Sequence, residues 1–157
     1  MGRPLAAYGA SMKQPILRVI CAVGQSGQMG LKGHLPWEGD RSPEYKADVA
    51  RFFEITRGQV LAAGPKTISS VPEFARLDRD LFVLRSSMGP EELFKRFAGR
   101  IVFIGGGPAV WDVYAPFVSH WDITRLPYDG PADRWFNPQW LTPNSLKRVE
   151  TVMQAER

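Results

Sequence analysis

The sequence predicts a single α/β domain in which a mixed, mainly parallel sheet is flanked by helices in three layers. Its 157 residues fit one domain. Apolar residues make up 44% of the chain and charged residues 23%, as in ordinary globular proteins. Short apolar runs alternate with helical stretches along the chain, which is typical of a parallel sheet covered on both faces.

Four short runs rich in branched and apolar residues predict buried strands, at residues 16–24, 59–64, 80–86 and 100–105. Three amphipathic stretches predict helices, at residues 43–57, 90–97 and 109–117. The first of these follows Ser42 and opens with Pro43, a common helix start. Beyond Phe117, two strand-like segments at 121–126 and 146–153 flank a proline-rich stretch, and they predict an antiparallel addition to the sheet edge.

Composition narrows the possible partners. Twenty Lys and Arg against 16 Asp and Glu give a net charge of +4, and the basic residues are scattered, which favours a small phosphate-bearing molecule over nucleic acid. One cysteine excludes a disulfide framework, and two distant histidines leave too few ligands for zinc, so we expect no metal. The apolar runs are shorter than the ~20 residues of a membrane span, and residues 1–14 lack the apolar run of a signal peptide. We therefore expect no membrane partner and a cytoplasmic protein.

Gly105, Gly106 and Gly107 lie between a predicted strand and a predicted helix. Glycines at this place let the backbone approach a pyrophosphate and offer N–H groups to it. A tight strand-to-helix turn would explain the same glycines. The fingerprint G-x-G-x-x-G is absent, so this is not an ordinary Rossmann turn.

Two further motifs precede and open the first predicted helix. A glycine-rich loop ends in Leu35-Pro36-Trp37, and it is either a mobile lid over a bound ring or a surface loop held by its aromatic residue. On the helix, Asp48, Phe52 and Thr56 are spaced by four residues and therefore share one face. A carboxylate on such a face suits a protonated heterocycle if it faces a pocket, whereas a solvated acid is the simpler explanation.

Together these motifs resemble the dihydrofolate reductase family, from about Ile16 to Phe136. The resemblance implies NADPH-dependent reduction of 7,8-dihydrofolate to 5,6,7,8-tetrahydrofolate, by hydride transfer from the nicotinamide and protonation of the pterin. This is a reaction of one-carbon metabolism that antifolates target. It also implies a monomer, with a dihydrofolate-reductase-like domain at 15–157 behind a flexible leader at 1–14.

The resemblance also assigns site residues. The catalytic group comprises the acid, its supporting threonine and the lid residues: Asp48, Thr124, Leu35 and Trp37. Substrate-binding residues come from the first strand, the acid-bearing helix and later segments: Ile20, Cys21, Ala22, Val49, Phe52, Val71, Arg79 and Ile104. Cofactor-binding residues come from the glycine segments and their neighbours: Ala22, Gly30, Leu31, Gly64, Lys66, Thr67, Arg85, Ser86, Gly105, Gly106, Gly107 and Trp111. A cis peptide bond is expected at Gly105-Gly106, and Arg79 is expected to hold the glutamate carboxylate of the substrate.

An insertion at 38–47 separates Trp37 from the acid-bearing helix. Its many charged residues predict an exposed turn and an early helical extension, with none of them in the core. Asp40 or Glu44 could then compete with Asp48 as the acid, although the spacing favours Asp48. The segment either modulates the lid or is a surface excursion without functional effect.

Three other positions depart from the family pattern. Pro65 stands where the family has the arginine that grips the 2′-phosphate of the cofactor, which leaves Lys66 and Arg85 as candidates. Val110 competes with Trp111 for the place against the nicotinamide. Arg76 competes with Arg79, in the same loop, for the substrate carboxylate.

Two other functions remain open at this point. The related reductase of riboflavin synthesis acts on a ribosylated pyrimidine, but it lacks the Leu-Pro-Trp loop and the helix acid. A catalytically impaired pterin or nucleotide binder would account for Pro65 and the short segment after Phe136.

Overall fold

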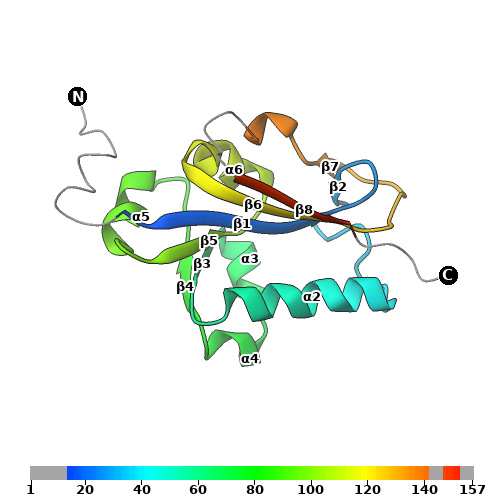
Figure 1. Cartoon of the computed structure of the whole chain (residues 1–157), viewed down its shortest axis with the longest axis horizontal. Helices are drawn as coiled ribbons and strands as arrows, with labels where there is room; N and C mark the ends of the chain where they lie inside the picture. Colours follow the sequence, from blue (N-terminus) through cyan, green and yellow to red (C-terminus); the bar gives the residue numbers. More distant parts are fainter. Residues whose placement is uncertain (1–13, 142–146, 153–157) are drawn as a thin grey trace.

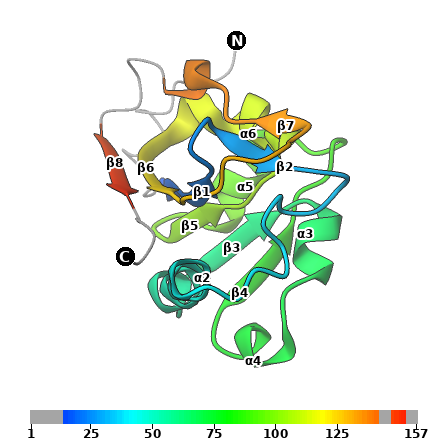
Figure 2. The same ribbon diagram turned by 90° about the vertical axis from the view of Figure 1, so that its right-hand side faces the viewer.

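The computed structural model describes residues 14–141 and 147–152, so the predicted leader lies almost wholly outside the described residues. Its centre is a six-stranded sheet with strand order β4-β3-β5-β1-β6-β8 (Figures 1 and 2). In chain order these strands are β1 (Ile16–Val23), β3 (Val60–Ala63), β4 (Asp80–Val83), β5 (Ile101–Ile104), β6 (Val118–Arg125) and β8 (Lys147–Val152). A separate two-stranded antiparallel sheet consists of β2 (Gln28–Gly30) and β7 (Arg134–Trp135).

The helices are α2 (Pro43–Thr56), α3 (Pro65–Ser69), α4 (Glu73–Arg76), α5 (Pro90–Arg96) and α6 (Pro108–Tyr114), with short 3₁₀ turns η1 (Ala115–Phe117) and η2 (Pro138–Trp140). Four of the α-helices begin at a proline, which fixes the backbone angle needed at the first helical position and lacks only an N–H that has no helical partner there. The long α2 lies along the sheet, as predicted for residues 43–57.

Alternate side chains of β1 enter two different cores. Leu17, Val19 and Val23 pack with residues of α5 and α6 on one face of the sheet. Ile20 points to the other face, where it packs with apolar residues of α2 and α3. The result is a helix–sheet–helix sandwich, and the predicted α/β fold with a mainly parallel sheet between helical layers is confirmed.

All pairings within the six-stranded sheet are parallel. The predicted antiparallel edge is therefore wrong, because β8 pairs with β6 in the parallel direction, His120 opposite Lys147 and Arg125 opposite Val152. The physical reason is the length of the connection between the two strands. A parallel crossover needs a dozen or more residues, and the proline-rich stretch between β6 and β8 exceeds that length.

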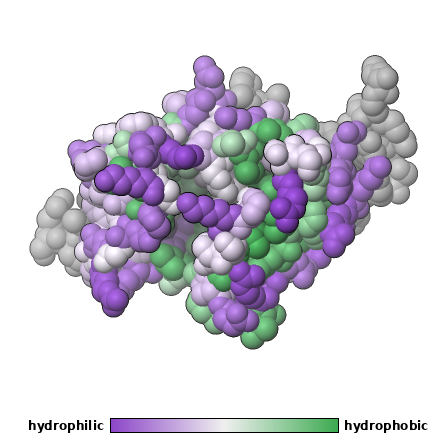
Figure 3. Space-filling model, turned by 180° about the vertical axis from the view of Figure 1, so that it is seen from behind, coloured by the Kyte–Doolittle hydropathy of each residue, from purple (hydrophilic) through white to green (hydrophobic). Residues whose placement is uncertain are grey.

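The outer surface is predominantly hydrophilic in the view from behind, with patches of hydrophobic residues between the polar ones (Figure 3). Within the ranges that the structure describes, none of the helices has both the length and the apolar composition that a membrane crossing requires.

Candidate functional site

One face of α2 turns toward the sheet and carries the predicted acid. Asp48 is half-buried, Phe52 packs one turn later against the core cluster around Ile20, and Thr56 is fully buried another turn on. The Thr56 hydroxyl donates a hydrogen bond to the Phe52 carbonyl oxygen at 2.9 Å. The four-residue spacing thus places these three side chains as the sequence predicts.

The two competing acids of the insertion occupy different surroundings. Asp40 is exposed, and its Oδ1 accepts a hydrogen bond from the Ser42 N–H at 2.8 Å, which lowers the pKa of Asp40. Glu44 is buried and has a polar or charged partner, so the expectation that every charged residue of the insertion stays outside the core is wrong. The helix begins at Pro43, which places Glu44 in the first turn, where the N-terminal end of the helix dipole favours a carboxylate.

Thr124 stands close to Asp48. It lies on β6, opposite Ala22 of β1. Burial raises the pKa of Asp48 above its ordinary value, while the Thr124 hydroxyl and the Arg51 guanidinium lower it in part and the Asp122 charge raises it further. The Thr124 hydroxyl is thus near enough to stabilise the carboxylate, but its buried Oγ1 forms no hydrogen bond of normal geometry with a described residue. The pair presents an acid of raised pKa beside a buried hydroxyl.

An ion pair that the sequence analysis missed lies next to Asp48. The Nη2 atom of Arg51 contacts the Oδ2 atom of Asp122 at 2.5 Å. Asp122 comes two residues before Thr124 on β6, so both side chains leave the strand on the same face. The signal that could have found it is an acid between two apolar neighbours, Trp121 and Ile123, in a predicted buried strand.

The first strand contributes apolar surface and a thiol. Ile20 is buried and Ala22 is half-buried in the layer toward α2. Cys21 packs against the opposite core. Burial raises the pKa of the Cys21 thiol, and the charges of Asp48 and Asp122 raise it further, so the thiol is neutral at physiological pH.

The glycine-rich loop is anchored by its aromatic residue. Trp37 is buried with Tyr45 and Leu126, and its ring lies 6.1 Å from that of Tyr45 and 5.7 Å from that of Tyr128. Leu35 is half exposed, at 49%. This arrangement corresponds to the alternative of a surface loop held by its aromatic residue, and Trp37 is not a free lid residue, because four aromatic and aliphatic groups enclose it.

The earlier part of the same loop is held by backbone pairing. Gly30 lies in β2, opposite Arg134 of β7, and a Cβ added to Gly30 would lie 3.3 Å from the Arg134 Cβ. Leu31 forms an isolated bridge with His34. These two predicted cofactor-binding residues are therefore fixed at the start of the loop.

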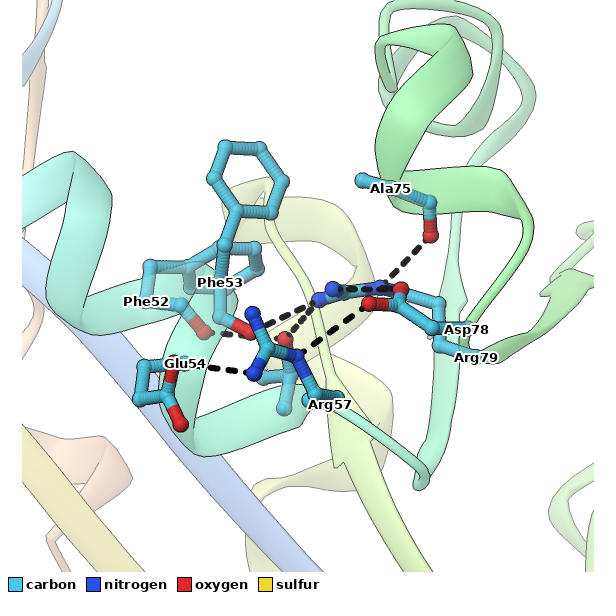
Figure 4. A network of polar contacts seen from close by, with 8 residues as sticks. Phe52, Phe53, Glu54, Arg57, Ala75, Asp78 and Arg79 are labelled. Atoms are coloured by element: carbon cyan, nitrogen blue, oxygen red, sulfur yellow. Dashed lines mark hydrogen bonds and ion pairs between the residues drawn. The ribbon is translucent and has the colours of Figure 1, made fainter.

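Arg79 does not face an open cleft. Its side chain is 1% exposed, and all three guanidinium nitrogens donate within the protein (Figure 4). The acceptors are the Ala75 and Phe53 carbonyl oxygens, the Thr56 hydroxyl and the Asp78 carboxylate. In the described structure the guanidinium joins α2 to the segment before β4, and its expected role in holding a substrate carboxylate stays a prediction.

The competing Arg76 is also bonded internally. Its Nε donates to the Val71 carbonyl oxygen at 2.9 Å and its Nη2 to that of Ile68 at 2.6 Å. Both arginines of this loop therefore serve the local structure first.

The glycine segments predicted to hold a cofactor lie together. The Thr67 hydroxyl donates to the Gly106 carbonyl oxygen at 3.3 Å, which joins the start of α3 to the turn before α6. A Cβ at Gly105 would come within 2.9 Å of the Ala63 Cβ, so packing against β3 explains this glycine. Gly64 and Gly107, in contrast, have no heavy atom within 4 Å of an added Cβ and border open space. The cis peptide bond is at Gly106-Gly107, one residue later than predicted.

The residues around these glycines divide into surface and core positions. Lys66, Arg85 and Ser86 are exposed, and neither of the two cations forms an ion pair with another residue of the described ranges. Trp111 is 2% exposed, and its Nε1 donates to the Ile104 carbonyl oxygen at 3.1 Å. The ring is enclosed in the aromatic core, whereas the alternative, Val110, is half-buried. Which of the two lies against a nicotinamide stays a prediction.

Three predicted substrate contacts differ in exposure. Val49 is 51% exposed next to Asp48, which leaves its side chain available. Val71 is buried at the edge of the core beneath α3. Ile104 is 1% exposed inside the core of α5 and α6, and its expected contact with the substrate stays a prediction.

In the described ranges, no three His, Cys, Asp or Glu side chains are arranged to hold a metal ion. No model of an established protein family matches the chain. The chain is 60% identical to a dihydromethanopterin reductase of Methylorubrum extorquens over 131 residues, which cover 83% of this chain and 97% of that protein. It is 24% identical to a dihydrofolate reductase of Saccharomyces cerevisiae, over 94% of this chain and 80% of the yeast protein.

Both relatives are pterin reductases by name, and the first is similar over nearly its whole length. The chain therefore belongs to the dihydrofolate-reductase-like family of pterin reductases, and it is an oxidoreductase.

Proposed function

We propose that this protein reduces a 7,8-dihydropterin of the methanopterin type with NADPH, and that dihydrofolate is the second candidate substrate. The observation that carries the proposal is Asp48, a half-buried carboxylate of raised pKa beside the buried hydroxyl of Thr124. A carboxylate of this kind binds the amino-pyrimidine edge of a pterin through charge-assisted hydrogen bonds. It also favours the protonated form of the ring, which is the form that accepts a hydride.

The surroundings of Asp48 support the same role. Phe52 and Val49 offer apolar surface on the same helix, and Ile20 and Ala22 do so from β1. An apolar wall excludes water around the reacting ring and strengthens the pairing of the carboxylate with the pterin.

The residues at the glycine edge fit a nicotinamide dinucleotide. Gly64 and Gly107 border space that a side chain would fill, and the two segments are joined by the Thr67 hydrogen bond. Lys66 and Arg85 would bind the 2′-phosphate, since Pro65 supplies no cation. When bound, NADPH supplies the hydride. The role of the chain is to hold the pterin ring against the nicotinamide and to keep the proton at the Asp48 edge.

Two observations favour the methanopterin type over dihydrofolate. The relative with 60% identity is named for dihydromethanopterin, whereas the relative named for dihydrofolate shares 24%. In addition, Arg79 is bonded internally and offers no free guanidinium to a glutamate carboxylate. The shared motifs from Ile20 to Thr124 keep dihydrofolate as the second candidate.

The test is NADPH oxidation by the purified protein, followed by absorbance, with dihydromethanopterin, dihydrofolate or a ribosylated pyrimidine as the acceptor. We expect the largest kcat/KM with dihydromethanopterin and a tetrahydro product by mass spectrometry. A larger kcat/KM with dihydrofolate would make the second candidate the function. Reduction of the pyrimidine alone, or pterin binding without any NADPH oxidation, would refute the proposal in favour of the riboflavin-type reductase or of a non-catalytic binder.

A further inference from the structure

Arg51 lies between two carboxylates and pairs with only one of them. Asp48 is three residues earlier on the same helix, a spacing at which side chains of a helix meet. Asp122 is on β6, and its Oδ2 is 2.5 Å from the Arg51 Nη2. Among the described residues no ion pair joins Arg51 to Asp48. The guanidinium is therefore turned away from its neighbour on the helix and toward the sheet.

The same cluster concentrates unused hydrogen-bonding atoms. Five buried side-chain nitrogen or oxygen atoms lack a hydrogen-bond partner in the described part of the chain, and three of them are here: Arg51 Nη1, Asp122 Oδ1 and Thr124 Oγ1. A buried polar atom without a partner costs free energy, so such atoms are rare unless water or a ligand completes them. Their concentration beside Asp48 points to a ligand at this place.

We propose that Asp122 is a positioning residue that holds Arg51 away from Asp48, so that the Asp48 carboxylate stays free for the heterocycle. The open atoms of Arg51, Asp122 and Thr124 then complete their hydrogen bonds on that ring or on waters bound with it. This second part rests on the proposed function, whereas the control of Asp48 by the ion pair does not.

The charge of the cluster fits a cationic ring. The charged groups that act on Asp48 in the described structure are Arg51 on its own helix and Asp122 on β6, while the Cys21 thiol, which packs on the other face of β1, is neutral. Two carboxylates and one guanidinium leave one negative charge, which favours a protonated amino-pyrimidine over a neutral or anionic ring. Were Arg51 to pair with Asp48 instead, the charge at the ring edge would be cancelled.

The two partners of the ion pair act on Asp48 in opposite directions. The Arg51 guanidinium lowers the pKa of Asp48, and the Asp122 carboxylate raises it. A pair with a merely structural role would, when broken from either side, loosen the site in the same way. Two charges that act on Asp48 independently would also give opposite shifts, so the positioning role is identified by coupling between them. The shift caused by Asp122→Asn should be larger with Arg51 present than in the Arg51→Met background.

The experiment is an NMR titration of the Asp48 carboxyl group in the full chain labelled on aspartate, assigned with Asp48→Asn. In Asp122→Asn the freed Arg51 turns to Asp48, and the titration midpoint should move to lower pH. In Arg51→Met it should move to higher pH. The double variant Arg51→Met/Asp122→Asn should have a midpoint that returns toward the wild-type value. Arg51→Lys keeps the positive charge, so its midpoint should equal that of the wild type. Arg57→Met, which removes a surface ion pair at the end of the same helix, is the matched control and should change nothing.

Activity then tests the link to the substrate. The KM for the pterin should rise at least roughly tenfold in Asp122→Asn and recover partly in the double variant, with little change in the KM for NADPH. In variants whose circular dichroism spectra show a folded protein, midpoints that move in the same direction or do not move would overturn the proposal. An Asp122→Asn shift that is the same with and without Arg51 would overturn it as well. Should the single variants not fold, Arg51→Gln and Asp122→Ser replace them in the same titration. The proposal then requires a midpoint at higher pH in Arg51→Gln and at lower pH in Asp122→Ser. Opposite midpoint shifts in a protein that reduces no pterin would refute only the proposed function.

Discussion

Two polar centres contact helix α2, and each contains an arginine, an aspartate and a threonine. The two centres differ in how many of their polar atoms have hydrogen-bond partners. On the middle turns of α2 Arg51 pairs with Asp122, and at its carboxyl end Arg79 pairs with Asp78. All three nitrogens of Arg79 donate to acceptors within the protein, and one of those acceptors is the hydroxyl of Thr56 (Figure 4).

The centre around Arg51 is incomplete by comparison. One guanidinium nitrogen, one carboxylate oxygen of Asp122 and the hydroxyl of Thr124 are buried without a partner. A fully bonded buried network rigidifies the fold, whereas an incomplete one reserves bonding capacity for something the chain does not itself provide. The comparison indicates that the centre at Arg79 stabilises the fold, and it supports the proposal that the centre at Asp48 binds a ligand.

The largest expected effect comes from neutralising the acid of the incomplete centre. Asp48→Asn should keep the fold but lower kcat at neutral pH by at least about 10²-fold, because an amide cannot hold the charge that favours protonation of the pterin. Residual activity should rise as the pH falls, since protonation of the substrate from solution replaces the effect of the carboxylate. Steady-state rates of NADPH oxidation measured across a range of pH give both the loss of kcat and the pH dependence of the residual activity. Asp40→Asn is the control and should keep its turnover. Wild-type turnover in Asp48→Asn together with loss of turnover in Asp40→Asn would mean that Asp40, and not Asp48, is the acid.

Breaking the complete centre should act on stability. Arg79→Ala removes a buried guanidinium and leaves the Phe53 carbonyl and the Thr56 hydroxyl without it, so the free energy of unfolding should fall by about 2–4 kcal/mol. Urea denaturation measures the change. The exposed Arg57, changed to Ala, should cost less than about 1 kcal/mol. A rise in the KM for the pterin with unchanged stability in Arg79→Ala would instead make this arginine a substrate residue.

A smaller effect is expected at cations that belong to neither centre. Lys66 and Arg85 are exposed and form no ion pair with a described residue, and Pro65, which precedes Lys66, carries no charge. Each change to Ala should lower the ratio of kcat/KM for NADPH to that for NADH by roughly threefold to tenfold. A ratio unaltered in both variants would show that neither cation binds the 2′-phosphate.

The smallest expected effect is on stability at the incomplete centre itself. The pKa of Asp48 in the folded protein lies above its ordinary value of 3.8, so the folded state binds the proton more tightly than the unfolded state. Stability then falls as pH rises from 3.8 through the folded pKa, and the charged carboxylate destabilises the fold above it. Asp48→Asn should therefore raise the thermal midpoint at neutral pH, with the gain vanishing below pH 3.8. Asp40→Asn should have the opposite sign, because the pKa of Asp40 is lowered.

The regular part of the fold was predictable because it depends on local pattern. The apolar runs of β1 and β5 and the helix after Ser42-Pro43 were predicted within a residue or two of their observed ends. The short α3, α4, β2 and β7 have too few residues for a hydrophobic period to show. The direction of β8 depends on the path of the chain between strands, which no local pattern carries.

The candidate site divides in the same way. Asp48 was predictable from its spacing to Phe52 and Thr56 on one helix, and Thr124 only from the family resemblance. The Arg51–Asp122 pair joins residues 71 positions apart, so neither residue is conspicuous by itself. At Glu44 the sequence analysis made a wrong prediction instead of missing a residue. The polarity of the side chain predicted exposure, whereas Glu44 is buried in the first turn of α2.

The wholly parallel pairing of the large sheet bears on how this chain reaches its native state. Neighbouring parallel strands cannot form as hairpins, and every one of the five pairings requires an intervening helix or long connection to be gathered first. The pairing of β1 with β6 joins segments about a hundred residues apart in sequence. Contacts of such separation slow folding and prolong the exposure of strand edges. The strand that carries Asp122 and Thr124 pairs with β1 only once two segments about a hundred residues apart have met, so we expect the candidate site to form late in folding.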